Sequence, residues 1–342
     1  MPAPNQSIFQ LVGHRGGESG LNSFIPEHSL AAYAIGASNG ATFLEPDVIS
    51  TKDHVLMVMH GNELGRTSDV SEHPEFADRY TTKLIDDGDG VTATNVTGWF
   101  SEDFTWEEVS TLRLRTVKNA NPGPLDGLYP FVKFTEMLDY VDELNAQLKY
   151  DYAVGVYPET KLANYFSSLG LPLEEQFMEA LADHGYCSYN EDGLCVESLK
   201  DETKGPCTLQ SFSSASLKTL ATMTDMVRVD LINGASVGVD KVSSDGKTAD
   251  PELIAGIAEY CDVISIPTSM DEDLFASVVQ TSHDAGMDVH AWVADMDQTL
   301  FTRLADLDIE GSFVNDISYA RGALEMREAM LAEQEAKKVE AC

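Results

Sequence analysis

Two carboxylates within one apolar stretch carry the strongest chemical signal in the sequence. The run Gly40–His60 holds Glu45 and Asp47 two residues apart and ends at a histidine, His60. In an extended chain, residues i and i+2 point to the same face, so the two carboxylates should converge. Such hard oxygen ligands suit Mg²⁺ or Ca²⁺, and a nearby histidine can transfer a proton. An isolated Glu-x-Asp is more often a pair of solvated acids, so the interpretation depends on the motifs around it.

Pro46 separates the two carboxylates and marks the point where we expect the strand to end. Proline has no amide hydrogen to donate to the ladder of a sheet. The pair would then lie at the rim of the sheet, where active sites commonly form.

Polar side chains also stand at or just after the ends of other predicted strands. The motif His14-Arg15-Gly16-Gly17 follows the apolar run Ile8–Gly13, and Glu159 follows Tyr152–Tyr157. The polar residues in such positions are His14, Glu45, Asp47, Glu159, Gln210 and Asp295. They are the candidates for a common site.

The alternation of strands and helices predicts how these residues are brought together. Apolar runs begin near residues 8, 41, 152, 207, 226, 263, 288 and 311, with helical periodicity between them. Helices are expected over 134–148, 173–183, 214–221, 251–260, 271–285 and 297–305. Eight βα units predict an α/β fold, a closed (β/α)8 TIM barrel whose strands share one catalytic rim at their carboxyl ends.

The remaining segments are assigned to the same domain, which we expect to span residues 1–342. Residues 61–104 are polar, acidic and too long for a simple connection, so they should form an inserted loop or small subdomain after the second strand. Residues 317–342 should form a charged C-terminal helix.

Composition excludes several classes of partner. The formal net charge of −35, from 57 acidic and 22 basic side chains, argues against nucleic acid, whose phosphates would be repelled. No apolar run approaches the ~20 residues of a transmembrane helix. We therefore expect a small-molecule substrate, and an anionic one must meet locally placed Arg or Lys. The oligomeric state is left open.

The cysteines and the N-terminus leave compartment undecided. Cys187, Cys195 and Cys207 are clustered, and either one disulfide within this cluster or buried free thiols would fit. No charged region followed by a long apolar region opens the chain. The protein is then cytoplasmic, or it is secreted, periplasmic or organellar and a leader has been removed.

Several motifs in the same order resemble the glycerophosphodiester phosphodiesterase family, in particular its periplasmic bacterial and plant branches. The resemblance covers nearly the whole chain. The matching motifs are His14-Arg15-Gly16, Pro26-Glu27-His28-Ser29, Glu45-Pro46-Asp47-Val48, Thr51-Lys52-Asp53, His60, Arg66-Thr67-Ser68-Asp69-Val70, Phe104–Glu108, Tyr129-Pro130-Phe131, Tyr157-Pro158-Glu159-Thr160-Lys161, Leu209-Gln210-Ser211-Phe212 and Val289–Val293.

The resemblance implies a metal centre and a catalytic pair. Glu45, Asp47 and Glu159 would bind one divalent cation, Ca²⁺ or Mg²⁺. His14 and His60 would be the acid and base. Three carboxylates attract a hard cation, which can polarise a phosphoryl oxygen and collect negative charge in the transition state.

The resemblance also implies residues that bind the substrate. Arg15 and Lys161 would contact the phosphate, Glu27 would orient Arg15, and Trp292 would either line the substrate pocket or pack in the core. We interpret the other histidines as structural or solvated, namely His28, His54, His73, His184, His283 and His290.

Two functions follow from these assignments. The first is metal-dependent hydrolysis of glycerophosphodiesters, such as glycerophosphocholine or glycerophosphoethanolamine, to glycerol 3-phosphate and an alcohol. The attacking oxygen could belong to water or to the glycerol 2-hydroxyl. The alternative is a catalytically weak barrel that serves as a binding or cell-surface protein. Its main support is Gly61, which stands where most family members have Asp directly after the second histidine, so His60 must be oriented by another group.

Overall fold

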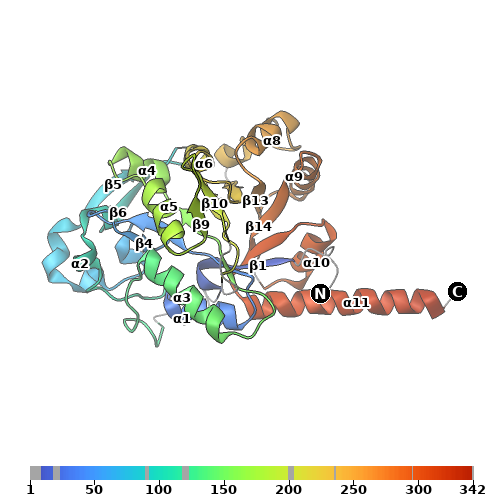
Figure 1. Cartoon of the computed structure of the whole chain (residues 1–342), viewed down its shortest axis with the longest axis horizontal. Helices are drawn as coiled ribbons and strands as arrows, with labels where there is room; N and C mark the ends of the chain where they lie inside the picture. The colour runs from blue at the N-terminus through green and yellow to red at the C-terminus, as the bar shows by residue number, and fades with distance from the viewer. Residues whose placement is uncertain are drawn as a thin grey trace.

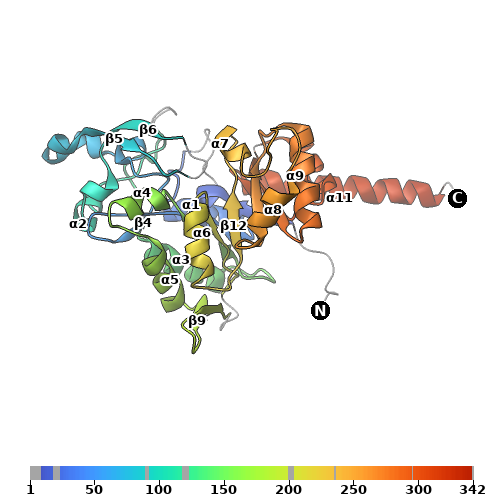
Figure 2. The ribbon, with the colours of Figure 1, turned by 90° about the horizontal axis from the view of Figure 1, so that it is seen from above.

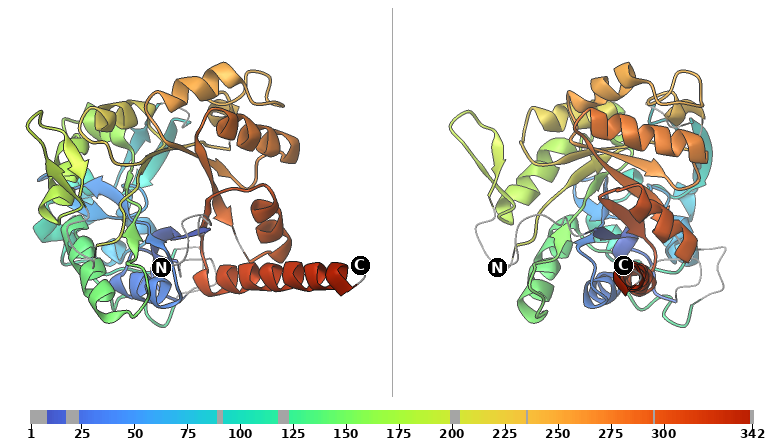
Figure 3. Two further views of the ribbon diagram at one scale, coloured as in Figure 1. Left: turned by 45° about the vertical axis from the view of Figure 1, so that its right-hand side comes forward. Right: turned by 90° about the vertical axis from the view of Figure 1, so that its right-hand side faces the viewer.

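A ring of parallel strands forms the centre of the molecule (Figure 3). The computed structural model describes residues 9–17, 24–88, 92–117, 123–198, 204–234, 236–294 and 296–340. The strands of the ring are β1 (Gln10–Gly13), β2 (Phe43–Leu44), β3 (Asp47–Ser50), β7 (Gly155–Val156), β8 (Glu159–Thr160), β11 (Leu209–Ser211), β12 (Arg228–Leu231), β13 (Val263–Pro267), β14 (Asp288–Ala294) and β15 (Gly311–Val314).

The pairing of these strands closes the ring. β1 pairs in parallel with β15 on one side and with β2 on the other. β2 pairs with β7, and their continuations β3 and β8 also pair, after which β8 leads to β11. With each interrupted strand counted once, the described residues form eight parallel strands. The predicted (β/α)8 barrel is therefore confirmed.

The strand that contains Pro46 is interrupted there but does not end, so this part of the prediction was wrong. β2 stops at Leu44 and β3 resumes at Asp47, and Pro158 separates β7 from β8 in the same way. Proline removes one donor, but the carbonyl of Pro46 still accepts a hydrogen bond from the amide of Glu159 at 2.9 Å. The ladder can therefore continue on the far side of each proline.

Helices surround the ring and bury their apolar faces against it (Figure 1). The six predicted helices are confirmed to within two residues at each end. The helices after the insertion are α3 (Phe134–Gln147), α4 (Ala163–Ser168), α5 (Glu174–Asp183), α6 (Ser214–Ala221), α7 (Ser236–Val239), α8 (Pro251–Ala258), α9 (Glu272–Asp284) and α10 (Gln298–Asp306), and α1 (Leu30–Ser38) precedes it.

The segment expected to be an insertion and the C-terminal helix lie at opposite ends of the molecule (Figure 2). After β4 (Leu56–Val58), which runs antiparallel to β3, residues 61–104 form short helical turns and an antiparallel hairpin. These elements are η2 (Leu64–Arg66), η3 (Val70–Glu72), η4 (Pro74–Arg79), β5 (Thr81–Ile85), β6 (Thr94–Gly98) and η5 (Ser101–Asp103), followed by α2 (Trp106–Val109). The last helix, α11 (Ile317–Glu340), extends beyond the barrel (Figure 1).

A buried carboxylate ties this segment to the barrel. Glu102 accepts hydrogen bonds from the Asn62 amide at 3.2 Å and from the Tyr165 hydroxyl at 2.7 Å, and it pairs with Lys83 at 2.9 Å. Because Tyr165 belongs to α4 and Asn62 lies two residues after His60, these contacts fix the start of the segment next to the rim.

The structure decides between the two alternatives for the cysteine cluster. Cys187 and Cys195 form a disulfide between β9 (Cys187–Tyr189) and β10 (Cys195–Glu197). Cys207 and Cys261 are buried free thiols. Among the described helices, none has both the length and the apolar character required to cross a bilayer.

One histidine lies inside the barrel beneath the rim. His290 is buried, and its Nδ1 is 2.8 Å from the hydroxyl of Tyr157, whose ring packs between Phe43 and Phe313. Burial lowers the pKa of His290 to about 4, because the charged imidazolium would lose its hydration. The interpretation of this histidine as structural agrees with its position.

We expect His290 to make the barrel sensitive to acid. The folded pKa lies below the unfolded value, so the unfolded chain binds the extra proton as the pH falls from about 6.5 to about 4, and stability is lost in that window. Relative to His290→Gln, the wild type should lose about 3 kcal/mol of unfolding free energy between pH 7 and pH 4. Chemical denaturation of the wild type and of His290→Gln between pH 7 and pH 4 measures this loss. A constant difference between them would contradict the assignment.

Candidate active site

The carboxyl ends of the strands surround a pocket with about 360 Å³ of empty space. The residues that line it come from nearly every strand of the ring and from the loops that follow, as expected for a barrel rim. They are His14, Arg15, Glu45, Asp47, His60, Glu159, Lys161, Gln210, Phe212, Leu231, Trp292, Val293 and Phe313.

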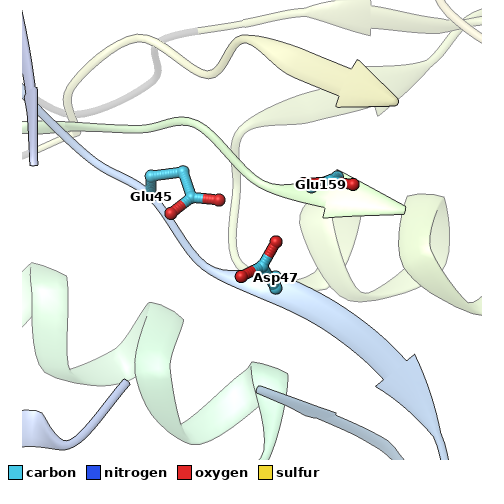
Figure 4. A group of neighbouring side chains, drawn as sticks. All are labelled: Glu45, Asp47 and Glu159. Atoms are coloured by element: carbon cyan, nitrogen blue, oxygen red, sulfur yellow. The ribbon is translucent and has the colours of Figure 1, made fainter. Parts of the chain in front are cut away.

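Three buried carboxylates converge at the base of this pocket (Figure 4). Oxygen atoms of Glu45, Asp47 and Glu159 all lie within 4.8 Å of one another. Glu45 and Asp47 flank Pro46 at the break between β2 and β3, and Asp47 is in register with Glu159 on β8. The interruption of the two neighbouring strands therefore brings the three side chains to one point.

The backbone and side chains around Glu45 hold its carboxylate in place. The amide of Arg15 donates to its Oε2 at 2.7 Å, and the Gln210 side chain donates to its Oε1 at 3.2 Å. Arg15 reaches this position with a φ of 52°, in the left-handed region that non-glycine residues seldom adopt. Burial and the neighbouring Asp47 raise the pKa of Glu45 well above its usual value.

Asp47 is the carboxylate with the most positive surroundings. His28, itself buried, donates from Nε2 to Oδ2 at 2.8 Å, and the Lys161 ammonium is 3.3 Å from Oδ1. Burial opposes ionisation, but Lys161, His60 and His28 together hold the pKa of Asp47 well below its usual value. Asp47 is therefore ionised and available as an anionic ligand.

Glu159 is the carboxylate whose surroundings most directly indicate a missing partner. Its Oε2 accepts from Lys161 at 3.1 Å, whereas Oε1 is buried and has no hydrogen-bond partner among the described residues. Burial raises the pKa of Glu159 well above its usual value, against the pull of Lys161. A buried acceptor without a donor is costly. Three converging hard oxygen donors with one such orphan fit a divalent cation.

Two basic side chains reach the same pocket beside the carboxylates. The Arg15 guanidinium pairs with Glu27 at 2.8 Å and is 3.7 Å from Asp47. The Lys161 ammonium lies 5.3 Å from the centre of the Phe212 ring. Despite burial, Asp47 and Glu159 raise the pKa of Lys161, so it stays charged. The pocket thus offers positive charge within a strongly acidic protein.

His14 is fixed by a hydrogen bond from the far end of the chain. Its Nδ1 is 2.7 Å from the side-chain oxygen of Asn315, which follows β15. An amide oxygen can only accept, so Nδ1 carries the proton and Nε2 has the lone pair. Burial and, secondly, Arg15 lower the pKa of His14 to about 3. The neutral ring is therefore the form present near neutral pH.

His60 is fixed by a different kind of partner. Arg66 donates from one guanidinium nitrogen to Nδ1 of His60 at 2.9 Å and to its carbonyl oxygen at 3.1 Å. Burial, Arg15 and Lys161 lower the pKa of His60 well below its ordinary value. The side chain that orients His60 is thus an arginine five residues beyond Gly61.

The structure brings most of the predicted site residues together. Eight of the nine line the pocket, and the ninth, Glu27, pairs with Arg15 as expected. Trp292 lies in the wall, where its ring meets Phe212 edge-on at 5.5 Å. Gln210 also lines the pocket, while Asp295 lies outside the described residues.

Sequence reasoning missed three residues that hold the site. His28 was interpreted as structural or solvated, but it binds Asp47 directly, and Asn315 and Arg66 were given no role. His28 and Arg66 both stand in motifs that matched the family, which was the available signal. Asn315 is the last residue of the strand predicted from residue 311, so its position at the rim could have been foreseen.

The chain resembles known proteins in both sequence and fold. The model of the glycerophosphoryl diester phosphodiesterase family matches residues 14–318. Glycerophosphodiester phosphodiesterase GDPD6 of Arabidopsis thaliana is 30% identical over 297 residues, which are 82% of this chain and 73% of the relative.

Solved structures with the same fold have lower sequence identity. A phosphodiesterase of Oleispira antarctica, in complex with the product sn-glycerol-3-phosphate, is 17% identical with a TM-score of 0.59, covering 92% of this chain and 96% of its own. A glycerophosphodiester phosphodiesterase of Parabacteroides distasonis is 14% identical with a TM-score of 0.60, covering 95% and 100%. Because the family model spans nearly the whole chain, including both histidines and all three carboxylates, this protein belongs to the glycerophosphoryl diester phosphodiesterase family.

Proposed function

We propose that the protein hydrolyses glycerophosphodiesters, such as glycerophosphocholine and glycerophosphoethanolamine, to glycerol 3-phosphate and an alcohol. One observation carries the proposal: three carboxylates, two cationic side chains and two imidazoles meet in one pocket. Membership of the family supports the reaction class. The Oleispira antarctica enzyme with bound sn-glycerol-3-phosphate supports the choice of product.

The cofactor that we propose is one divalent cation, Ca²⁺ or Mg²⁺, held by Glu45, Asp47 and Glu159. The orphaned Oε1 of Glu159 supports this set of ligands. When bound, the cation would polarise a phosphoryl oxygen and offset negative charge that develops on it.

Arg15 and Lys161 are proposed to bind the phosphate of the substrate. The protein has a formal net charge of −35, so a phosphodiester approaching it is repelled at long range. Both cationic groups stand within the pocket and beside the carboxylates, where their charges act over short distances in a poorly hydrated site. Guanidinium and ammonium donors also form strong, charge-assisted hydrogen bonds to phosphate oxygens.

The two imidazoles are proposed to have opposite roles. The Nε2 lone pair of His14 suits a base, which would remove the proton from the attacking water or glycerol 2-hydroxyl. His60 would face the oxygen of the departing alcohol and donate a hydrogen bond to it, and the proton that His14 has accepted would then pass to that oxygen, so that the alcohol leaves neutral. Burial lowers the pKa of both rings, which favours two neutral rings with different tautomers.

The alternative, a weak or inactive barrel that binds its ligand without turnover, rested on Gly61. Arg66 donates a hydrogen bond to Nδ1 of His60, so the ring is oriented although position 61 has no side chain, and this support is reduced. Release of glycerol 3-phosphate from glycerophosphocholine, followed with added Mg²⁺ or Ca²⁺ and then with excess chelator, separates the two functions. Binding without product release would favour the alternative.

We predict that the cation stabilises the fold through the three carboxylates. At a concentration about 100 times its Kd, binding contributes about 2.7 kcal/mol. Glu159→Gln should abolish the rise in Tm on adding Mg²⁺ or Ca²⁺, yet leave the cation-free protein about as stable, because burial already disfavours the ionised form of Glu159.

The matched control for this measurement is Glu325→Gln on α11, an exposed carboxylate paired with Arg321 away from the pocket. It should keep the full rise in Tm. An unchanged rise in Glu159→Gln would show that the cation binds elsewhere.

A second prediction concerns the base. General acid–base catalysis is worth ~10²–10⁴-fold, so His14→Ala should lower kcat for glycerophosphocholine by at least about 10²-fold. The rise in Tm with Mg²⁺ should persist, because His14 is not among the proposed ligands. Wild-type turnover in His14→Ala would exclude it as the base, and loss of the Tm response would show that the substitution damages the metal site instead.

A further inference from the structure

Arg66 makes an unusual contact for a residue near a catalytic histidine. One nitrogen of its guanidinium lies 2.9 Å from Nδ1 of His60 and 3.1 Å from the carbonyl oxygen of the same residue. A carboxylate in this place would accept a hydrogen bond from a protonated Nδ1, whereas the arginine guanidinium can only donate one. Nδ1 of His60 must therefore provide a lone pair, and in the neutral ring the proton is on Nε2.

A buried carboxylate, Glu27, holds Arg66 in its contact with His60. Glu27 is nearly fully buried and pairs with Arg66 at 3.1 Å and with Arg15 at 2.8 Å. The carboxylate thus holds two guanidinium groups, one against His60 and one beside Asp47. If Arg66 turned away from His60, Glu27 would keep only Arg15 as an ion-pair partner among the described residues. The pairing with Glu27 therefore holds Arg66 in place.

Gly61, directly after His60, faces open space. Its φ is +85°, and a Cβ built on it meets no atom of the described chain within 4 Å. The residue after His60 therefore contributes no side chain to orient the ring. Arg66, on the short helical turn η2, performs this task from five residues further along the chain.

We propose that Arg66 is the positioning residue that fixes the tautomer of His60, so that the neutral ring presents Nε2–H to the pocket as a hydrogen-bond donor. The catalytic consequence rests on the proposed function, whereas the tautomer does not. His14, with its proton on Nδ1 through Asn315, has the opposite tautomer. Asn315 thereby leaves His14 with an acceptor nitrogen for the substrate, and Arg66 leaves His60 with a donor N–H.

Nuclear magnetic resonance of ¹⁵N-histidine-labelled protein saturated with Mg²⁺ tests the tautomer directly. We expect Nδ1 of His60 to have the shift of an unprotonated ring nitrogen and Nε2 that of a protonated one, with His60→Gln identifying the signals. In Arg66→Met the two nitrogens should move toward a mixture of tautomers. A protonated Nδ1 in the wild type, or unchanged signals in Arg66→Met, would overturn the proposal.

Kinetics with two substrates that differ in their leaving groups test the proposed role of the His60 Nε2–H donor. Choline leaves glycerophosphocholine as a poor leaving group that needs a donor, whereas the 4-nitrophenolate of glyceryl 4-nitrophenyl phosphate needs little help. Since loss of positioning can cost about 10²-fold, Arg66→Met should lower kcat for glycerophosphocholine by up to that factor and for the nitrophenyl ester by much less. Arg66→Lys, which keeps the charge but loses the fork, should fall between Arg66→Met and wild type.

The matched control is Arg79→Met. Arg79 belongs to the same 61–104 segment as Arg66, pairs with Glu108 and does not line the pocket. This variant should leave both rates and the His60 signals unchanged. Equal losses of Arg66→Met on both substrates would show a merely structural role and overturn the catalytic part. If the wild type hydrolyses neither substrate, the proposed function fails, and the ¹⁵N spectra still decide whether Arg66 fixes His60.

Discussion

The site depends on keeping three carboxylates close together inside the protein. Buried like charges repel one another and lose their hydration, and burial raises the pKa of Glu45 and Glu159 accordingly. Asp47 stays ionised because Lys161 and His28 face its two oxygens. The cationic groups that would bind a phosphate thus also offset the repulsion among the carboxylates, so the proposed metal ligands and the proposed phosphate contacts form one electrostatic unit.

The backbone supplies the geometry for this unit through two interrupted strands. Prolines break neighbouring strands at the same level of the barrel, between β2 and β3 and between β7 and β8. Each break is followed by a carboxylate, and the register pairs Asp47 with Glu159. Because the ladders resume beyond the prolines, the carboxylates are held by regular sheet on both sides. A rigid frame of this kind limits the movement that their repulsion would otherwise cause.

The segment after β4 is part of the catalytic rim and not only a surface addition. Arg66 comes from this segment and contacts His60, while Glu27 joins it to Arg15. Glu102, in the same segment, holds Asn62 close to His60 and is bound by Tyr165 of α4. The orientation of the second histidine therefore depends on packing of the segment against the barrel, which links the stability of this region to catalysis.

The sequence by itself determined the barrel and the convergence of Glu45, Asp47 and Glu159, because hydrophobic periodicity and the strand-end positions of polar residues are local features. Tertiary structure decided what each of these groups contacts. Arg15 and His28 have φ values of 52° and 61°, which no local pattern indicated, and these turns aim the Arg15 amide at Glu45 and the His28 ring at Asp47.

The same distinction holds for the histidines and the cysteines. Asn315 meets His14 across 301 positions of the chain, and Arg66 meets His60 across six. Cys187 pairs with Cys195 because their strands are adjacent, while Cys207 is buried elsewhere. Periodicity shows which face of an element is buried, but side-chain partners depend on distances between elements, and only the folded chain sets those distances.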